Sequence, residues 1–296
     1  MTDPLYLIGI AVEPKSQNDG ERLAAALADL TAKDASFTIA IDIESGQTIL
    51  KGNSEKHLDD VLGVLINTYG VGLNIGAPAV AYLETITRKT KIDHTHKRID
   101  GRNSQFARVM FTFEPGARGS SFVFRSAITG GTVPEAFIPG VEKGLEATRQ
   151  NGLLAGYPVT DMIATLTDGK FHDLDSSALA FEVAAAGAFK KLRSEGGPVL
   201  LEPVMRLDVA TPEDCLGAII ADLAKRRGVI TSQTVNGGES DLAGCVPLTN
   251  LFGYGNVLAR LSQDRATWTM TFDRYAPVRS PEPPDDVFPP AIGMRA

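Results

Sequence analysis

The stretch Gly169-Lys170-Phe171-His172-Asp173-Leu174-Asp175-Ser176-Ser177 lies between two segments of different periodicity. Residues 162–167 before it alternate apolar and polar side chains, as a β-strand does. The alanine-rich segment after it has apolar residues at helical spacing: Phe181, Ala185, Ala188, Phe189 and Leu192. We expect Asp175 to accept hydrogen bonds from the first turn of this helix. The pattern therefore predicts a strand, a polar tip with an imidazole and two carboxylates, and a packed helix.

Length and composition indicate a globular protein of two or three domains. The chain has 296 residues, of which 43% are apolar and 22% charged, enough to form ordinary hydrophobic cores. The sequence shows neither a long apolar span nor a basic-then-apolar leader, so we expect a cytoplasmic protein outside the membrane. Cys215 and Cys245 lack metal-site spacing and are interpreted as reduced core thiols.

The charge is unevenly distributed along the chain. The net charge is −7, which argues against a general binder of polyanions. Between Arg88 and Arg108, however, seven Lys or Arg residues stand against two Asp residues. Either a solvated charged face or a surface that meets phosphate would have this composition, and composition alone does not decide between them.

The first part of the chain has the element order of a ferredoxin-like module. Residues 5–12 predict an apolar strand, and Ser16 with Asp19 predicts the capped start of a helix. Further strands are expected at 37–43, 47–51 and 71–75, with a helix over residues 58–69. This order is strand, helix, strand, strand, helix, strand.

The last part of the chain repeats that order, beginning with a strand over residues 199–210. Thr211-Pro212-Glu213-Asp214 predicts a helix start capped by Thr211. Lys225-Arg226-Arg227-Gly228 predicts its end, with glycine as the left-handed residue. A hairpin is expected at Asn236-Gly237-Gly238, then a helix and an alternating strand.

The predicted fold class is therefore α+β, with two βαββαβ modules flanking a different middle domain. We expect the domains at residues 1–87, 88–196 and 197–278, followed by a proline-rich tail at 279–296. In the middle domain, two or three strands precede a turn at Gly130-Gly131 and a helix with Phe137, Val141 and Leu145. The tail has little to pack and is expected to be mobile or extended.

The sequence offers no catalytic or metal site of its own. It contains no phosphate-binding loop, so nucleotide binding by this chain alone is not expected. His94 and His96 share one strand face, and an exposed basic strand explains them better than a metal site that lacks a third ligand. Ser176 and Ser177 lie near His172 without a nucleophile motif, and we interpret them as helix-start residues.

Several motifs, in order, resemble the last three domains of elongation factor G. The third-domain motifs are Val12-Glu13-Pro14-Lys15 and Glu44-Ser45-Gly46-Gln47-Thr48. The fourth-domain motifs are Gly130-Gly131, Pro134, Ile138-Pro139, the segment from Leu154 to Met162, and the His172 tip. The fifth-domain motifs are Leu200-Leu201-Glu202-Pro203, Lys225-Arg226-Arg227-Gly228 and Phe252-Gly253-Tyr254. The resemblance covers about residues 6–278.

The resemblance implies a ribosome-binding role in the translocation of transfer and messenger RNA. It implies that His172, Asp173, Gly101, Arg102 and Gln105 contact RNA at the decoding site. It also implies that Ser45, Gly46 and Gln47 face the GTPase domain, and that Lys225, Arg226 and Arg227 approach ribosomal RNA. GTP and Mg²⁺ would bind to a G domain absent from this sequence, and no cofactor is expected in this chain. The middle domain would contain a left-handed βαβ crossover.

Two segments depart from the family's pattern. Family members usually have Ser-Gly-Gly-x-Gly-Gln-Tyr where this chain has Asp100-Gly101-Arg102-Asn103-Ser104-Gln105-Phe106. The lost glycines would stiffen this loop, and Asp100 would repel RNA. The usual Gly-Met-Gly-Glu-Leu-His-Leu appears as Gly52-Asn53-Ser54-Glu55-Lys56-His57-Leu58. The chain therefore resembles a divergent paralogue.

Three functions remain open from the sequence. The first is the RNA-contacting part of a monomeric translocase, expressed as a fragment because its start coincides with a domain junction of the family. The second is a ribosome-protection or recycling factor of the same superfamily. The third is a stand-alone, acidic ribosome-binding adaptor without a GTPase, which would explain the net charge of −7.

Overall fold

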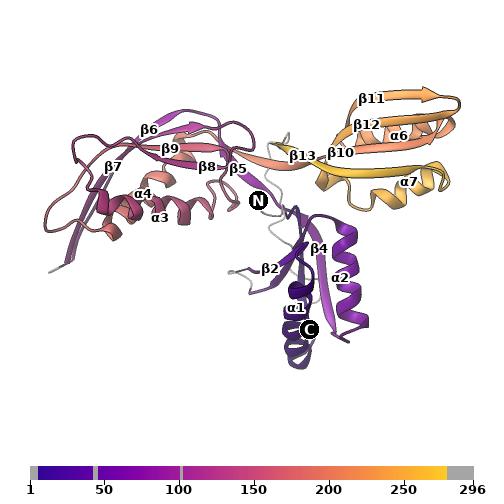
Figure 1. Ribbon diagram of the computed structural model, residues 1–296, viewed down its shortest axis with the longest axis horizontal. Helices are drawn as coiled ribbons and strands as arrows, with labels where there is room; N and C mark the ends of the chain where they lie inside the picture. The colour runs from indigo at the N-terminus through magenta and orange to yellow at the C-terminus, as the bar shows by residue number, and fades with distance from the viewer. Residues whose placement is uncertain (1–5, 43–45, 101–102, 279–296) are drawn as a thin grey trace. The chain divides into compact units, whose positions relative to one another are not determined.

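The structure is a computed structural model that describes residues 6–42, 46–100 and 103–278 (Figure 1). Four predicted features lie outside these ranges: Ser45, Gly101, Arg102 and the tail from Arg279. The chain divides into two compact units. Among the described residues, one contains those up to Ala81 together with Glu202–Arg274, and the other contains Tyr82–Leu201 together with residues 275–278.

The first four strands form an antiparallel sheet in the order β2-β3-β1-β4. Its elements are β1 (Ile8–Pro14), α1 (Gln17–Lys33), β2 (Phe37–Ile41), β3 (Thr48–Gly52), α2 (Glu55–Asn67) and β4 (Leu73–Val80). This order confirms the predicted ferredoxin-like module, although its last strand extends further than the predicted 71–75. Ser16 caps α1 as predicted, because its side chain accepts a hydrogen bond from the Asp19 amide at 3.1 Å.

The last part of the chain forms a second sheet with the same topology, β11-β12-β10-β13. Its elements are β10 (Pro198–Pro212), α6 (Glu213–Lys225), β11 (Val229–Asn236), β12 (Glu239–Pro247), the 3-10 helix η2 (Leu248–Asn250), α7 (Tyr254–Ser262) and β13 (Thr267–Pro277). Gly237 and Gly238 both have positive φ and connect β11 to β12 in the predicted hairpin.

The two predicted ends of α6 were wrong in detail. Thr211 belongs to β10, and its buried hydroxyl has no hydrogen-bond partner, so Pro212 stands at the N-cap without a side-chain bond. At the other end, Arg227 has the left-handed conformation, with φ 63°. Gly228 is needed for a different reason: a Cβ there would lie 2.7 Å from the Leu223 carbonyl oxygen, which accepts the Gly228 amide.

The middle part of the chain forms a four-stranded sheet in the order β6-β7-β9-β8. Its elements are β6 (Thr90–Asp100), β7 (Asn103–Pro115), β8 (Phe122–Ser126), the 3-10 helix η1 (Glu135–Phe137), α3 (Ile138–Arg149), β9 (Met162–Lys170), α4 (Ala178–Lys190) and α5 (Leu192–Glu195). Strands β8 and β9 are parallel, with α3 between them in the chain. The left-handed sense of this crossover stays a prediction.

Helices α3 and α4 pack closely together beside this sheet (Figure 1). The predicted helical stripe is confirmed, since Phe181, Ala185, Ala188, Phe189 and Leu192 are all fully buried. Gly140 and Gly144 permit the close approach of α3 to α4: a Cβ on either glycine would lie within 2.3 Å of a carbonyl oxygen of α4. This packing fixes the start of α4, where the polar tip ends.

Candidate functional site

The polar tip predicted around His172 is a tight loop between β9 and α4. The backbone amides of Asp175 and Ser176 donate to the His172 carbonyl at 3.3 and 3.0 Å. Ser177, rather than the predicted Asp175, caps α4 by accepting from the Ala180 amide at 3.2 Å. Aspartate and serine both occur often as N-caps, so the sequence alone did not distinguish Asp175 from Ser177. Asp175 lies two residues before the N-cap, too early to reach the first turn of α4.

Ser176 fastens this loop to the neighbouring hairpin. Its hydroxyl accepts from the His172 amide at 2.9 Å and donates to the Phe106 carbonyl at 2.6 Å. The Phe106 amide in turn donates to the Asp175 carbonyl at 2.9 Å. The loop therefore continues the hydrogen bonding of β7 at the point where β9 has ended.

The imidazole of His172 is exposed but oriented. Its side chain is 57% exposed, and Nδ1 lies 3.2 Å from Asp175 Oδ2 and 3.4 Å from the Leu174 amide nitrogen. Both contacts use Nδ1 and neither uses Nε2. A ring held by one nitrogen can present the other as a hydrogen-bond donor or acceptor to a ligand. Asp173 is also exposed in this loop.

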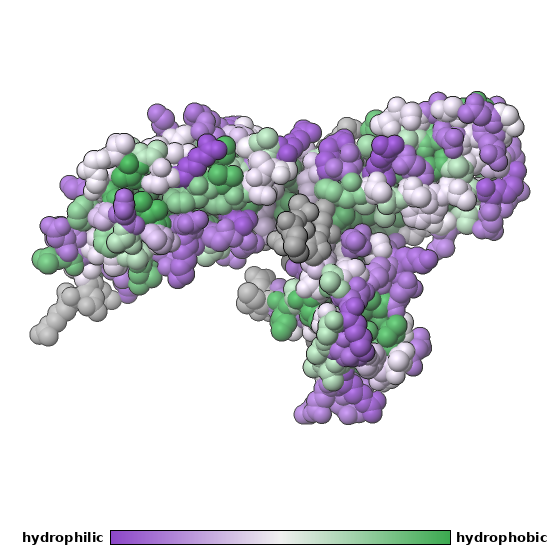
Figure 2. Space-filling model, in the orientation of Figure 1, coloured by the Kyte–Doolittle hydropathy of each residue, from purple (hydrophilic) through white to green (hydrophobic). Residues whose placement is uncertain are grey.

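A groove of about 410 Å³ lies beside the tip. It is lined by Lys97, Arg98, Ile99, Ser104, Gln105, Phe106, Lys170, Phe171, His172 and Asp175. The structure thus brings Gln105 and His172 to one groove, together with three cations from β6 and β9. Apolar side chains are exposed at this end as well, with Ile99 at 72% and Leu174 at 89%, and Figure 2 shows hydrophobic and hydrophilic residues side by side here.

Two cations at the other end of the β6–β7 hairpin are paired with acids. Further along the hairpin, Lys89 pairs with Glu114 at 2.6 Å, and Arg108 forms a two-pronged ion pair with Asp93. These pairs compensate the charges of Lys89 and Arg108, which lie away from the tip. The hairpin stays paired out to Asp100 and Asn103, so Ser104, which replaces a family glycine, is a strand residue.

His94 and His96 do not form the exposed strand face that the sequence suggested. His94 is half-buried against α4, where a Cβ on Gly187 would lie 2.3 Å from its Nε2. Burial, together with the nearby Lys191 ammonium, lowers the pKa of His94. His96 Nε2 lies 2.9 Å from Gln105 Oε1 and so helps to orient a groove residue. Within residues 6–42, 46–100 and 103–278, no three His, Cys, Asp or Glu side chains are grouped to hold a metal ion.

The other predicted contact residues occupy different surroundings. Gly46 is exposed with φ 71°, whereas Gln47 is buried. The Gly46 amide donates to the Asp42 carbonyl at 2.8 Å, and the Asp42 amide donates to the Gln47 carbonyl at 2.9 Å. Lys225 is exposed at the end of α6. Arg226 and Arg227 point at their own domain: Arg226 bonds Asp222 and the Asn250 carbonyl and lies over the Tyr254 ring, and Arg227 pairs with the buried Glu202.

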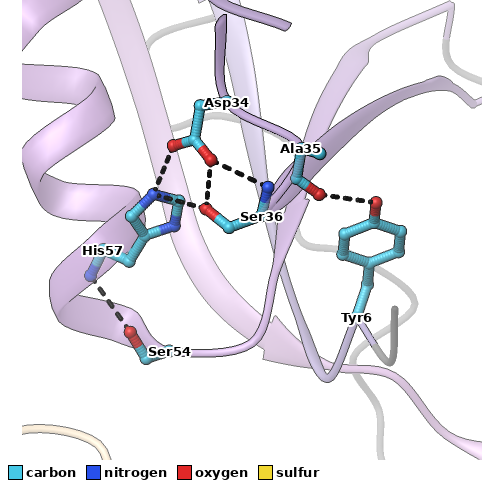
Figure 3. Close-up of polar contacts among 6 residues, drawn as sticks. All are labelled: Tyr6, Asp34, Ala35, Ser36, Ser54 and His57. Atoms are coloured by element: carbon cyan, nitrogen blue, oxygen red, sulfur yellow. Dashed lines mark hydrogen bonds and ion pairs between the residues drawn. The ribbon is translucent and has the colours of Figure 1, made fainter. Parts of the chain in front are cut away.

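Asp34, Ser36 and His57 form a polar cluster in the first module (Figure 3). Ser36 Oγ donates to Asp34 Oδ1 at 2.5 Å, and His57 Nε2 lies 2.9 Å from Asp34 Oδ2. The hydrogen bonds from Ser36, followed by the one from His57, lower the pKa of Asp34 to about 2. The Ser36 hydroxyl also lies 3.0 Å from His57 Nε2, the same nitrogen that faces Asp34. In a catalytic triad the acid and the serine bond to opposite nitrogens of the ring, so this cluster does not have that arrangement.

One fully buried acid, Glu84 in β5 (Leu83–Ile86), was missed by sequence reasoning. Its carboxylate accepts hydrogen bonds from four backbone amides of the segment 153–157. No periodic pattern marks such a contact, because one side chain meets a loop that is about 70 residues away in the chain.

Along the described ranges, no helix is both long and apolar enough to cross a membrane.

Comparisons with known proteins agree with this architecture. Family models described as "Elongation Factor G, domain III", "Elongation factor G, domain IV" and "Elongation factor G C-terminus" match residues 4–77, 78–196 and 199–285. Curated proteins called "Elongation factor G" from Hyphomonas neptunium and Rhodopseudomonas palustris are 53% and 51% identical over 93% of this chain.

The chain spans 39% and 40% of the length of these two relatives. A crystal structure of a protein from Thermus thermophilus is similar with a TM-score of 0.74 and 35% identity, over 94% of this chain and 41% of that one. The matches follow the sheets in chain order and leave few residues uncovered. The chain therefore belongs to the elongation factor G family and corresponds to the family's domain III, domain IV and C-terminal region.

Proposed function

We propose that this chain is the ribosome- and RNA-contacting part of a translational GTPase that promotes the translocation of transfer and messenger RNA. The observation that carries this proposal is the tip: an oriented, exposed imidazole beside a groove with Lys97, Arg98 and Lys170 on its walls. Cations attract the RNA backbone, and an imidazole with a serine and an amide can bond to 2′-hydroxyls and base edges.

The hydrolysis of GTP that drives translocation would take place in another part of the protein. GTP and Mg²⁺ would bind to a G domain outside this sequence, which acts on these domains in the same polypeptide. The segment at Gly46 and Gln47 would face that domain, and Lys225 is the most exposed of the three cations proposed to approach ribosomal RNA. The names of the matched relatives favour elongation over the ribosome-protection and adaptor alternatives.

The test is a chimera in which residues 1–296 replace the matching segment of the Hyphomonas neptunium elongation factor G. We expect the chimera to translocate, and His172→Ala to slow single-turnover translocation about tenfold, because one hydrogen bond to RNA is worth about 1–1.5 kcal/mol. Ribosome-stimulated GTP hydrolysis should stay unchanged. Lys190→Ala, which removes an exposed lysine at the end of α4, is the control for surface changes.

Two results would contradict the proposal. A chimera that folds and binds ribosomes but does not translocate would refute the assignment of function. A His172→Ala chimera with unchanged translocation kinetics would remove the imidazole from the RNA contact, because the substitution cannot disturb a core: the side chain is more than half exposed.

A further inference from the structure

The side chain of Glu84 is completely buried, and its carboxylate is surrounded by backbone amide groups that donate hydrogen bonds. Glu84 Oε2 accepts from the Leu153 amide and, at 2.8 Å, from the Leu154 amide. Glu84 Oε1 accepts from the Ala155 and Tyr157 amides at 2.8 and 3.2 Å. An ionised carboxylate away from water needs such partners, and bonds to a charged acceptor are roughly twice as strong as neutral ones.

The loop is shaped to enclose this carboxylate. Gly152 has φ 67°, and a Cβ at this position would lie 2.8 Å from Glu84 Oε1 and 2.6 Å from the Tyr157 carbonyl oxygen. The Val159 amide donates to the Arg149 carbonyl at 2.9 Å, which ties the end of the loop to the C-terminus of α3. The acid therefore joins β5 to the helix layer of the middle domain, and not only to a surface loop.

The backbone of β5 is hydrogen-bonded on both of its edges, to the middle domain on one and to β10 on the other. On one edge, the Glu84 amide donates to the Pro158 carbonyl at 2.9 Å, and the Thr160 amide donates to the Glu84 carbonyl at 2.8 Å. On the other edge, β5 pairs with the start of β10, from Leu83↔Leu201 to Ile86↔Pro198. We call β5 and residues 198–201 the stem, because the chain enters and leaves the β6–β9 domain through them.

Besides Glu84, the side chain of Ile86 attaches the stem to that domain, because it is buried in the domain's hydrophobic core. The Thr85 hydroxyl donates to the Asp161 carbonyl at 3.3 Å. The Thr87 hydroxyl donates to the Gly197 carbonyl, which joins the two ends of the stem to each other. Among the described stem residues, Glu84 alone carries four hydrogen bonds from one side chain to the domain body. Both oxygens of the planar Glu84 carboxylate are held by two amides each, so these bonds resist both translation and rotation of β5 relative to the loop 153–157.

We propose that Glu84 is a positioning residue that locks the β6–β9 domain to the stem, so that a displacement of the stem carries the tip with it as one body. This inference rests on the proposed function of the tip. Glu84 does not touch RNA in this proposal. It acts through the loop 153–157, and its effect on translocation is to keep the distance between stem and tip constant while force is transmitted.

The decisive change is Glu84→Gln, which keeps the size of the side chain. The amide group of glutamine has one acceptor oxygen, so its nitrogen must face two of the four backbone donors. We expect the amides of residues 153–157 to exchange hydrogen about 100-fold faster or more, since buried donors lose charge-assisted bonds. The matched control is Asp161→Asn. Asp161 is also buried, and its carboxylate accepts from the Gly119 and Ser121 amides at 2.9 and 3.2 Å. The stem meets only the backbone carbonyl of Asp161, which this substitution keeps.

The first measurement uses this chain with spin labels at Val199 in the stem and Lys97 on the hairpin, in a background without Cys215 and Cys245. Electron–electron resonance should show a broader distance distribution for Glu84→Gln and an unchanged one for Asp161→Asn. Equal distributions in all three proteins, or equal broadening in both variants, would overturn the proposal. If Glu84→Gln does not fold, Glu84→Asp, which is too short to reach all four amides, is held to the same criterion.

The second measurement uses the chimera described above and separates this inference from the proposed function. We expect Glu84→Gln to slow translocation about tenfold without changing ribosome-stimulated GTP hydrolysis, and Asp161→Asn to change neither. Slow translocation by His172→Ala with normal translocation by Glu84→Gln would refute the positioning role and leave the tip's function intact. A chimera that never translocates would refute the proposed function of the chain. The spin-label distances would then still test whether Glu84 holds the β6–β9 domain on the stem.

Discussion

Gly144→Ala tests whether the close packing of α3 on α4 holds the tip in place. A Cβ at Gly144 would lie 2.2 Å from the Glu182 carbonyl oxygen and 2.9 Å from its carbon. Both atoms belong to the backbone of α4, so no side chain can move aside. The two helices must separate, and α4 must move at the end that begins at Ser177, directly after the tip.

The size of the effect follows from this geometry. A methyl carbon normally stays about 3.5 Å from its neighbours, so the helices must part by roughly 1 Å, which forfeits a quarter to a half of each dispersion contact across the gap. Overpacking of this kind costs about 1–3 kcal/mol, and alanine regains at most ~1 kcal/mol through its higher helix propensity. With the lost contacts of Val141, Leu145 and Ala184 included, we expect a net loss of about 2–4 kcal/mol.

The assay is native-state hydrogen exchange of α3, α4 and β7, read together with thermal unfolding. A loss of that size should lower the melting temperature of the middle unit by roughly 10 °C. The matched control is Gly217→Ala in α6, since Gly217 is exposed and a Cβ there meets no atom within 4 Å. That variant should gain about 0.5–1 kcal/mol, and Trp268, the only tryptophan, reports on its unit.

The two glycines thus predict effects of opposite sign from the same substitution. A Gly144→Ala protein as stable as the parent would refute the packing argument, because it would show that α3 and α4 can separate at no cost. If Gly144→Ala destabilises the unit without changing exchange at residues 172–177, the link between helix spacing and the tip would fail while the packing argument stands.

Three further predictions concern single side chains. The pKa of Asp34 in the folded protein, about 2, is lower than its ordinary value of 3.8, so its contribution to the free energy of unfolding is complete above about pH 4 and is lost as the pH falls towards 2. In denaturant unfolding at a series of pH values, Asp34→Asn should therefore make stability depend less on pH in this range. An unchanged pH dependence would refute the role of Asp34. Arg227→Ala should cost about 1–3 kcal/mol by denaturant unfolding, because it leaves the buried Glu202 without its charged partner, which is itself 35% exposed. Adding Glu202→Gln should recover part of the loss, and strict additivity would count against the pair. Burial raises the pKa of Tyr254 to about 12. Burial raises the pKa of Tyr275 as well, so an ultraviolet titration should find more than one phenol that ionises late, and Tyr254→Phe should remove one of them; an unchanged titration would refute the assignment.

The features that local rules could predict from the sequence are those in which neighbouring residues decide the structure. The apolar stripes, the Ser16 cap and the turn at Gly237-Gly238 each depend on a few adjacent positions. The repeated βαββαβ order followed from them, and both sheets have that topology. The resemblance to elongation factor G added the fourth-domain fold, whose parallel β8–β9 pairing no local pattern could have specified.

Prediction failed where two residues of similar propensity compete for one role. The sequence favours Gly228 for the left-handed end of α6, yet Arg227 takes that conformation because Gly228 is needed next to the Leu223 carbonyl. Asp175 and Ser177 both suit a cap, and the length of the tip loop selects Ser177. In each case a close contact made elsewhere in the fold overrides the local preference.

The tip and the stem are attached in the same way, which explains why sequence patterns do not reveal these attachments. In both, a polar side chain bonds to the backbone of a segment some 70 residues away: Ser176 to Phe106, and Glu84 to Leu154. The backbone partner can be any residue, so only one side of the contact constrains the sequence. The hairpin that carries Lys97 and Gln105 can therefore diverge from the glycine-rich family pattern without losing its attachment. By the same reasoning, Glu84 and Ser176 should tolerate fewer substitutions than the basic residues that line the groove.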